Sequence, residues 1–317
     1  MAGGAAMTGL RTAIAGYLEL RRSLGFKLRT DERLLLDFAA FMERRHATHI
    51  TAKLAVRWAQ QPASTDPNYH AGRLRAVRSF ARHRILTDPR TEIPPTDLLP
   101  KQRSSFQPHI FTGEEIGSIL TASLRSRGCA TRFYCLCHYT IYGLLSVTGM
   151  RVSEALNLDV DDVDLVSGVI TIRNAKFGKS RFVPVHETTR AALEAYLAQR
   201  DAHLAGRKVD AFFISVPGRR IIPSVLDGAF RKLTRRLGMR DATGPVGPRL
   251  HDLRHTMAIE VLRRCYSDGA DPERRLPALS TYLGHTHLNY TYWYLHQNPG
   301  LMTEAMARLQ HRWEAFA

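Results

Sequence analysis

The stretch FYCLCHYTIYGLLSVT at residues 133–148, followed by Gly149-Met150 and then RVSEALNL at residues 151–158, decides the fold of the second half of the chain. Its first part predicts a buried helix that ends at Gly149, because glycine commonly closes a helix in the left-handed conformation. Its last part predicts a short second helix. Arg151 therefore begins a helix directly after a glycine turn, where its guanidinium and the nearby backbone N–H groups can face an anion.

Residues on either side of this stretch predict more helices and one small β-hairpin. Two β-rich segments, residues 169–173 and 181–185, flank a polar segment with two lysines, which is typical of a hairpin. Thr112 and Glu115 have the spacing of a capping box. Further helices are expected at residues 114–124, 188–204, 224–237, 250–264 and 276–283 and after Pro299. Residues 110–317 are therefore predicted to form one α+β domain.

The N-terminal part is predicted to be an all-α domain over residues 1–88. Apolar residues recur there at helical spacing in four segments, and the turn signal Ser23-Leu24-Gly25-Phe26 divides the first two. Residues 89–109 are rich in proline and lack periodicity, which favours an extended linker. The chain is thus expected to be mainly α-helical, with two domains and a small β-hairpin in the second.

The charge of the chain points to a polyanionic partner. The net charge is +16 at pH 7, and a field of this size attracts nucleic acid. On the helix expected at residues 69–85, the side chains of Arg75, Arg78 and Arg82 stand at i, i+3 and i+7 and form one basic ridge. We predict that this ridge contacts double-stranded DNA; a solvated arginine face is the alternative interpretation.

The four cysteines are too few for a disulfide framework in a chain of 317 residues, which indicates a reducing compartment. A metal site built from Cys129, Cys135, Cys137 and His138 is disfavoured, because no second ligand pair follows at zinc-finger spacing, and buried thiols are preferred. No apolar run approaches the ~20 residues that span a bilayer, and the first residues lack a signal-peptide pattern. We expect a cytoplasmic, nucleoid-associated protein with no membrane contact, metal or cofactor.

Three more motifs carry side chains suited to chemistry on a phosphate. His251 and Arg254 stand at i and i+3, hence on one helix face, and pair a titratable imidazole with a permanent charge. Lys176 lies at the tip of the predicted hairpin, from which a lysine can reach into a groove. Leu283-Gly284-His285 is followed nine residues later by Tyr294.

In this order the motifs resemble those of the tyrosine recombinases, also called the phage integrase family, over most of residues 110–300. Thr148-Gly-Met-Arg151 is similar to the first-arginine motif of that family, His251-x-x-Arg254 to the second and Leu283-Gly-His285 to the third. The resemblance implies a helical core-binding domain at the N-terminus. It also implies a set of active-site residues, which are Arg151, Lys176, His251, Arg254 and His285, with Tyr294 as the nucleophile.

The resemblance implies a recombinase reaction that needs neither metal nor ATP. The tyrosine attacks a phosphate, forms a 3′-phosphotyrosyl intermediate and releases a 5′-hydroxyl, while arginines and histidines stabilise the charge on the non-bridging oxygens. A tyrosine with an ordinary pKa of ~10 needs a base, for which His251 is the candidate, and Lys176 is the expected acid. We expect a homo-oligomeric synapse, a tetramer on DNA open to sister recombinases, that moves a mobile element.

Several alternatives stay open at this point. Lys179 shares the hairpin with Lys176. Tyr290 and Tyr292 stand close to Tyr294, which is favoured by its spacing from the third motif. The rival functions are a type IB topoisomerase with the same chemistry and a non-catalytic DNA-binding accessory factor with the same fold.

The C-terminal residues predict an amphipathic helix. Its apolar stripe is formed by Met302, Met306, Leu309, Trp313 and Phe316. This stripe could pack on its own domain, but the resemblance favours docking on a neighbouring protomer.

Overall fold

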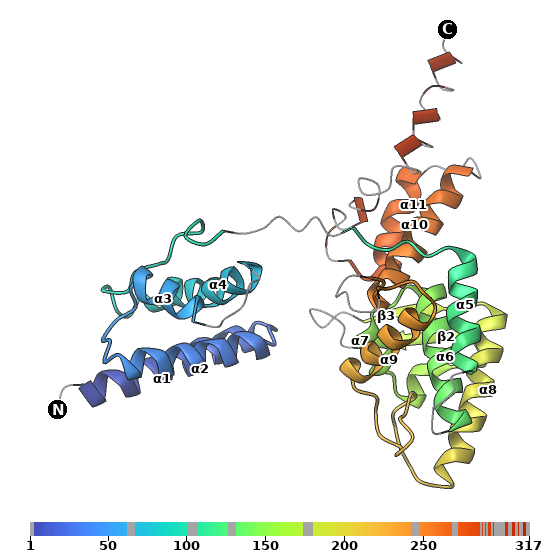
Figure 1. The fold of residues 1–317 in the computed structure, drawn as a ribbon, viewed down its shortest axis with the longest axis horizontal. Helices are drawn as coiled ribbons and strands as arrows, with labels where there is room; N and C mark the ends of the chain where they lie inside the picture. Colours follow the sequence, from blue (N-terminus) through green and yellow to red (C-terminus); the bar gives the residue numbers. More distant parts are fainter. Residues whose placement is uncertain are drawn as a thin grey trace. The chain divides into compact units, whose positions relative to one another are not determined.

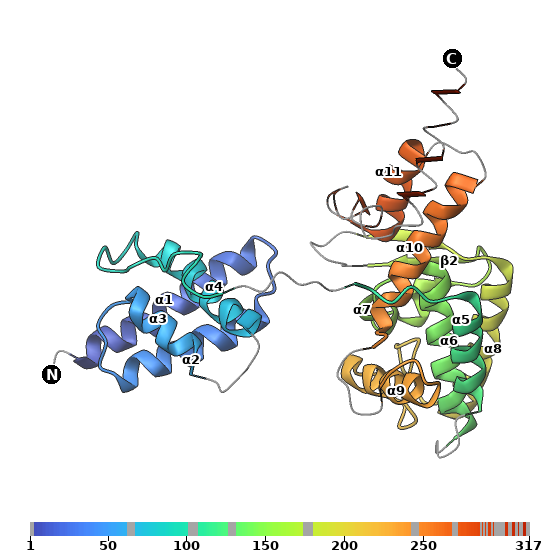
Figure 2. The ribbon, with the colours of Figure 1, turned by 45° about the horizontal axis from the view of Figure 1, so that its top comes forward.

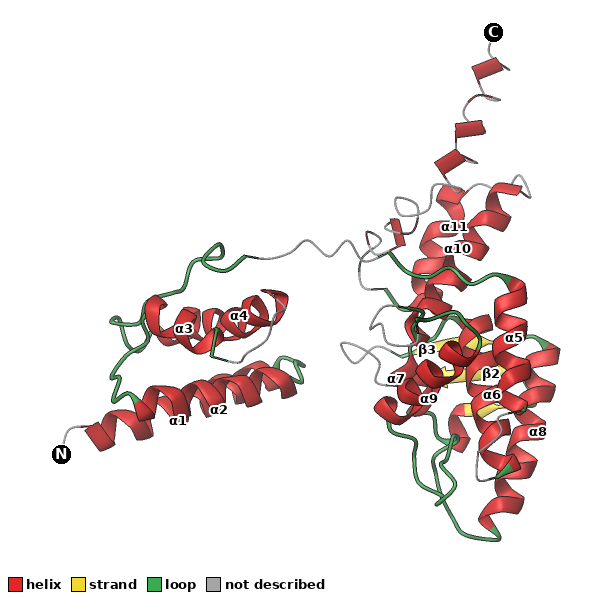
Figure 3. Cartoon of the chain, viewed as in Figure 1, coloured by secondary structure: helices red, strands yellow, loops and turns green. Residues whose placement is uncertain are grey.

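The computed structural model describes residues 3–61, 67–100, 107–125, 131–173, 180–241, 247–267 and 272–285, and beyond them residues 287, 289, 291, 292, 294, 302, 303, 306, 307, 310, 313 and 314. The chain forms two compact units, Met1–Phe106 and Gln107–Ala317 (Figure 1). Both units are mainly helical, and the second also contains a small sheet (Figure 3). The predicted fold class is therefore confirmed.

The first unit is a helical bundle, without a strand among its described residues. Its helices are α1 (Gly3–Ser23), α2 (Arg29–Arg44), α3 (Ala52–Ala59) and α4 (Pro67–Arg84). Gly25 turns the chain between α1 and α2 with a φ of 85°. Phe38, Trp58 and Phe80 are fully buried between the helices. Burial of this apolar face stabilises helices that would be marginal in isolation.

Part of the segment expected to be a linker is packed on the first unit. The Arg78 guanidinium donates through Nε to the Pro94 carbonyl (2.6 Å) and through Nη2 to the Pro95 carbonyl (2.5 Å). Leu99 is 6% exposed and belongs to the core of the same unit. These contacts hold the proline-rich residues against α4. The first part of the segment 89–109 is therefore packed on the helical bundle and is not an extended linker.

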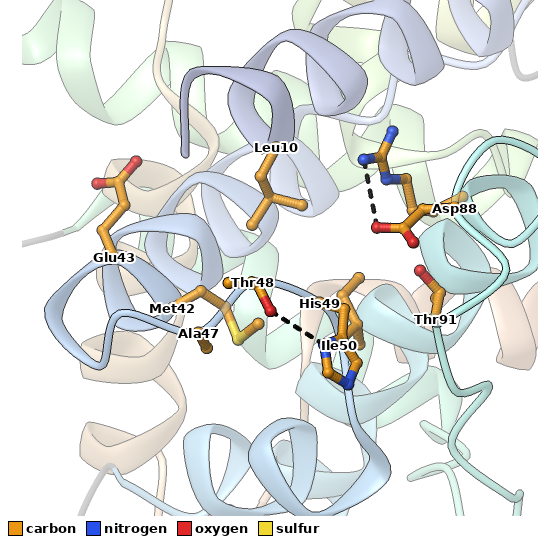
Figure 4. A pocket seen from close by; sticks show the side chains of 10 residues that line it. Leu10, Met42, Glu43, Ala47, Thr48, His49, Ile50, Asp88 and Thr91 are labelled. Atoms are coloured by element: carbon orange, nitrogen blue, oxygen red, sulfur yellow. Dashed lines mark hydrogen bonds and ion pairs between the residues drawn. The ribbon is translucent and has the colours of Figure 1, made fainter. Parts of the chain in front are cut away.

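A small pocket lies between α1, the end of α2 and the residues that follow α4 (Figure 4). Its volume is about 20 Å³, which suffices for no more than a single water molecule. Arg84 forms an ion pair with Asp88 across 3.6 Å, and Thr48 Oγ1 lies 3.2 Å from His49 Nδ1. We interpret this pocket as a packing defect of the bundle.

The second unit contains an antiparallel sheet with the strand order β1-β2-β3. The strands are β1 (Val163–Asp164), β2 (Val169–Ile172) and β3 (Arg181–Pro184). Ile170 pairs with Val183, and both are buried on the same face. β2 and β3 are the strands of the predicted hairpin. β1 was not predicted, because two residues are too few to display an alternating pattern.

Helices surround this sheet. They are α5 (Gly113–Leu124), α6 (Arg132–Thr148), α7 (Val152–Leu156), α8 (Glu187–Leu204), α9 (Pro223–Arg236), α10 (Leu250–Ser267) and α11 (Pro272–Leu283), with a short 3₁₀ helix η1 (Val160–Asp162) before β1. α6 is the central helix, since it contacts α5, α8 and α10, and α10 also packs along α11 (Figure 2). Thr112 and Glu115 form the predicted capping box at the start of α5.

The buried interior of α6 accounts for the clustered cysteines. Cys135 and Cys137 are buried free thiols, as is Cys265 on α10, whereas Cys129 lies outside the described residues. Burial raises the pKa of the Cys137 thiol to about 12, so this group stays protonated. The interpretation as buried thiols holds for the cysteines that the structure describes.

Two further observations concern the surface. Among the described residues, no helix has both the length and the apolar character that crossing a membrane requires. In the C-terminal stripe, the described residues Met302, Met306 and Trp313 are exposed, with Trp313 at 77%. Leu309 and Phe316 lie outside the described residues.

Candidate active site

Arg151 lies between the end of α6 and the start of α7. Gly149 ends α6 with a φ of 59°, and a Cβ atom there would lie only 3.1 Å from Met257 Sδ and 3.2 Å from Leu283 Cδ2, so the turn needs glycine. Arg151 then donates its backbone N–H to Glu154 Oε2 (2.8 Å) and its Nη1 to Glu154 Oε1 (2.7 Å). These bonds fix the arginine at the helix start that its sequence context predicted.

Arg254 lies on α10 and is 2% exposed. It donates through Nη1 to the Gly149 carbonyl (2.7 Å) and through Nη2 to the Leu283 carbonyl (2.6 Å). Burial, and after it the charge of Arg151, lowers the pKa of Arg254 to about 10, which still leaves the guanidinium charged at neutral pH.

The C-terminal end of α11 receives hydrogen bonds from three arginines that come from distant parts of the sequence. Carbonyls at a helix C-terminus lack intrahelical partners and carry the negative end of the helix dipole, so they bind cations well. The three bonds run from Arg181 Nε to the Tyr282 carbonyl (2.8 Å), from Arg254 Nη2 to the Leu283 carbonyl (2.6 Å) and from Arg151 Nη2 to the Gly284 carbonyl (3.0 Å). We call this group the α11 arginine cluster.

Glu154 is the carboxylate that joins two members of this cluster. It is 7% exposed and accepts from Arg181 Nη1 (3.0 Å) and Nη2 (2.8 Å), in addition to the bonds from Arg151. Burial acts to raise its pKa, but the hydrogen bonds from Arg181 and Arg151 outweigh burial and lower the pKa to about 2. The carboxylate therefore stays ionised between two arginines.

His285 and Tyr294 extend the site beyond α11. Thr291 Oγ1 lies 2.8 Å from His285 Nδ1, and Thr291 stands three residues before Tyr294, so both follow one helical face. The rings of His285 and Tyr294 are stacked with centroids 6.2 Å apart. Tyr294 is 2% exposed; burial raises its pKa, while the charge of Arg254 and a hydrogen bond from it act in the opposite direction.

Two histidines of α10 complete the site. The ring of His251 meets that of His255 edge to face at 4.7 Å, and the ring of His255 meets that of Tyr294 at 5.5 Å. Burial is the largest cause that lowers the pKa of His251 to about 4, and the charge of Arg254 is the next largest. Burial is also the main reason why the pKa of His255 is lowered to about 3 and that of His285 to about 4. All three imidazoles are thus neutral at pH 7.

The structure brings five of the six predicted active-site residues into one neighbourhood. They are Arg151, His251, Arg254, His285 and Tyr294. Lys176 and its rival Lys179 lie outside the described residues, as does Tyr290. Tyr292 is 41% exposed and makes none of the ring contacts that Tyr294 makes within the described chain.

Sequence reasoning missed four residues of this neighbourhood. Glu154, Thr291 and His255 each contact a predicted residue, and Arg181 binds Glu154. A signal existed for Glu154, which stands three residues after Arg151 at the third position of the helix, where an acid caps the helix start. For Arg181 no local pattern reveals its partners on α7 and α11, because they are far away in the sequence.

The predicted DNA-contacting arginines of α4 divide into two kinds. Arg75 and Arg82 are exposed. Arg78 is half-buried, and its Nε and Nη2 are bonded to the proline carbonyls described above. The ridge expected from the sequence is thus interrupted, and Arg78 has a structural contact that the helical spacing alone did not reveal.

Comparison with known proteins places this geometry in a family. The sequence pattern described as the phage integrase family matches residues 110–300. The chain is 47% identical to the putative integrase/recombinase y4rB of Sinorhizobium fredii (strain NBRC 101917 / NGR234), over 97% of this chain and 99% of that protein.

Solved structures share the fold at low sequence identity. The Tn1549 transposon integrase in complex with transposon right end DNA is 18% identical, with a TM-score of 0.66, over 95% of this chain and 98% of that chain. A lambda integrase tetramer bound to a Holliday junction is 17% identical, with a TM-score of 0.57, over 88% of this chain and 77% of that chain. The match over residues 110–300 and the 47% identity to y4rB show that the chain belongs to the phage integrase family, the tyrosine recombinases.

Proposed function

We propose that the protein is a site-specific DNA recombinase of a mobile element, which cuts and rejoins DNA strands through a phosphotyrosyl bond to Tyr294. The observation that carries this assignment of roles is the place of Tyr294, which is 2% exposed and whose ring packs against the rings of His255 on α10 (5.5 Å) and His285 (6.2 Å). A phenol oxygen beside a buried, charged arginine stands where an anionic phosphate would bind. This supports Tyr294 over Tyr292 as the nucleophile.

In the proposed reaction Tyr294 Oη attacks the scissile phosphorus, and the bond from phosphorus to the 5′-oxygen breaks. The phenol proton passes to His251, whose imidazole is neutral at pH 7 because its pKa is lowered to about 4. Lys176 gives a proton to the departing 5′-oxygen. Rejoining is the reverse, in which a 5′-hydroxyl attacks phosphorus and the tyrosine leaves, so the bond energy is kept and ATP is not needed.

The arginines supply the electrostatic part of the catalysis. Negative charge grows on the non-bridging oxygens in the transition state, and fixed donors in a dry site stabilise it strongly. Arg151 and Arg254 are held rigidly by carbonyls of α11 and of the glycine turn. Such fixed arginines need no reorganisation when the charge develops, and His285 adds a neutral hydrogen-bond donor beside them.

The proposed partner is double-stranded DNA, bound by a homo-oligomer that forms a tetrameric synapse. Support comes from the fold shared with the Tn1549 integrase on transposon DNA and with the lambda integrase tetramer on a Holliday junction. In the first unit, Arg75 and Arg82 are exposed and free to meet phosphates, and they remain the predicted contacts. Action on this DNA would bring the protein to the nucleoid, with or without sister recombinases.

The test is a nicked duplex suicide substrate that carries an end of the candidate element. Wild-type protein should form a covalent adduct that resists denaturation, and Tyr294→Phe should abolish it. Tyr292→Phe is the matched control and should retain the adduct. A covalent adduct that survives in Tyr294→Phe but not in Tyr292→Phe would overturn the assignment.

Two outcomes would favour the rival functions, which the comparisons do not favour. In a separate assay, relaxation of plasmids that lack any specific site would indicate a type IB topoisomerase. Absence of an adduct on every element end tested would indicate an accessory factor.

A further inference from the structure

Arg181, the first residue of β3, connects two of the motif segments without belonging to either. Its side chain is 11% exposed. One edge of the guanidinium binds both oxygens of Glu154 on α7, and Nε binds the Tyr282 carbonyl at the end of α11. A planar guanidinium can do this because its donors point in fixed, divergent directions.

The turn that carries His285 is shaped to fit this arginine. Gly284 has a φ of 67°, and a Cβ atom there would lie 2.9 Å from Arg181 Nη1, closer than real contacts allow. The backbone of the turn therefore lies directly against the guanidinium. A displacement of Arg181 would therefore also displace Gly284, whose carbonyl accepts a hydrogen bond from Arg151, and the neighbouring His285.

Charge gives Arg181 a second effect on Arg151. Glu154 is buried, and a buried carboxylate needs a cation close by. With Arg181 in place, two arginines share one carboxylate, so a net positive charge remains for a bound phosphate. Without Arg181, Glu154 would have Arg151 as its nearest cation, and the charge of Arg151 would be largely cancelled where the phosphate needs it.

We propose that Arg181 is a positioning residue for DNA cleavage: it neutralises Glu154 and supports the turn at Gly284, so that Arg151 and His285 face the scissile phosphate. This inference rests on the proposed function, because it takes Arg151 to act on that phosphate. Arg181 itself is not assigned a contact with DNA.

The test compares cleavage of a phosphodiester with cleavage of a methylphosphonate at the scissile position. A methylphosphonate carries no negative charge, so it gains little from an arginine that faces the phosphate. Arg181→Gln should therefore slow single-turnover cleavage of the phosphodiester by on the order of 100-fold and slow cleavage of the methylphosphonate much less. If both substrates lose the same factor, Arg181 only stabilises the fold and the proposal is wrong.

The matched control is Arg173→Gln. Arg173 stands just after β2, is exposed and pairs with Asp162 (2.7 Å), which is not a partner of the α11 arginine cluster. This variant should leave the ratio of the two cleavage rates unchanged. Wild-type protein that forms no adduct on either substrate would reject the proposed function itself, whereas active wild type with an unchanged ratio in Arg181→Gln rejects only the role of Arg181.

A double variant tests the role of charge directly. If Arg181 serves to neutralise Glu154, then Glu154→Gln should cost little once Arg181 is gone, so the double variant should cleave the phosphodiester no more slowly than Arg181→Gln alone. Additive losses in the double variant would show that the two side chains act independently and would contradict the proposal.

Discussion

Two exposed arginines of the first unit contrast with the arginines at the end of α11 in the second unit. On α4 of the first unit, Arg75 and Arg82 extend into solvent. At the end of α11 in the second unit, the arginines are bound to backbone carbonyls, and Arg254 is 2% exposed. Exposed arginine side chains can adjust to the phosphate backbone of DNA of any sequence, whereas buried arginine side chains are held in one position by their partners. The comparison teaches that burial and fixed partners, rather than residue type, separate candidates for catalysis from candidates for general DNA affinity.

The largest effect expected from this comparison is on cleavage by Arg254→Lys. A lysine keeps the charge but cannot bind the Gly149 and Leu283 carbonyls and the phosphate together, so cleavage should fall by roughly 100- to 1,000-fold. The measurement is the single-turnover rate of adduct formation. Arg75→Lys is the control and should stay within about twofold of wild type. Equal losses in the two variants would remove the distinction between the units.

Glu154→Gln should have the next largest effect, on stability. It leaves Arg151 and Arg181 without their carboxylate, and breaking such a buried pair costs about 3 kcal/mol. Urea unfolding of the second unit measures this. The control is Glu43→Gln, which removes an exposed pair with Arg11 (2.5 Å) in the first unit and should leave the urea unfolding of that unit nearly unchanged. A loss of about 3 kcal/mol in the first unit would contradict the argument from burial.

The carboxylate of Glu154 also determines how the stability of the folded protein changes with pH. Because the pKa of Glu154 in the folded protein, about 2, is below its ordinary value, the stabilisation is complete above about pH 4.5 and is lost as the pH falls toward 2. The histidines act in the same direction, since their pKa values are also lowered in the folded protein. In Glu154→Gln the part of the acid sensitivity below pH 4.5 should shrink.

Thr291→Val should have a smaller effect. It keeps the shape of the side chain but removes the hydroxyl that orients His285, and one such bond is worth about 1 kcal/mol, so cleavage should slow by roughly 5- to 10-fold. Thr291→Ser keeps the hydroxyl and should cleave close to the wild-type rate. If serine and valine behave alike, the hydrogen bond does not orient the imidazole during cleavage.

The smallest effect is expected on α4. Arg75→Gln and Arg82→Gln should each weaken DNA binding a few-fold at every sequence and reduce the slope of log affinity against log salt by about 1. Fluorescence anisotropy over a salt series measures this slope. Arg78→Gln should instead lower the stability of the first unit, because its guanidinium binds Pro94 and Pro95. If Arg78→Gln also reduced the slope of log affinity against log salt by about 1, then Arg78 would contact DNA together with Arg75 and Arg82, as the sequence predicted.

The sequence could predict whatever depends on local signals. The helix that ends at Gly149, the capping box of Thr112 and Glu115 and the hairpin of β2 and β3 all appear as expected, because each depends on neighbours within a few residues. The motif spacing also identified the family. The catalytic roles of the individual residues remain predictions that the experiments above address.

Long-range contacts account for what the sequence did not reveal. Arg181 shows its importance only when β3, α7 and α11 are folded together, and Arg78 is bound by carbonyls of a segment that its own helical pattern cannot indicate. Strand β1 is too short to produce a period. These features need the tertiary structure because the partners of each side chain are chosen by packing.

The end of α11 also sets the order in which competence is acquired during synthesis. Arg151, Arg181 and Arg254 leave the ribosome before the carbonyls of Tyr282, Leu283 and Gly284 that hold them. A chain that stops short of residue 282 lacks all three of these acceptors, so the α11 arginine cluster cannot be complete before the end of α11 has been made.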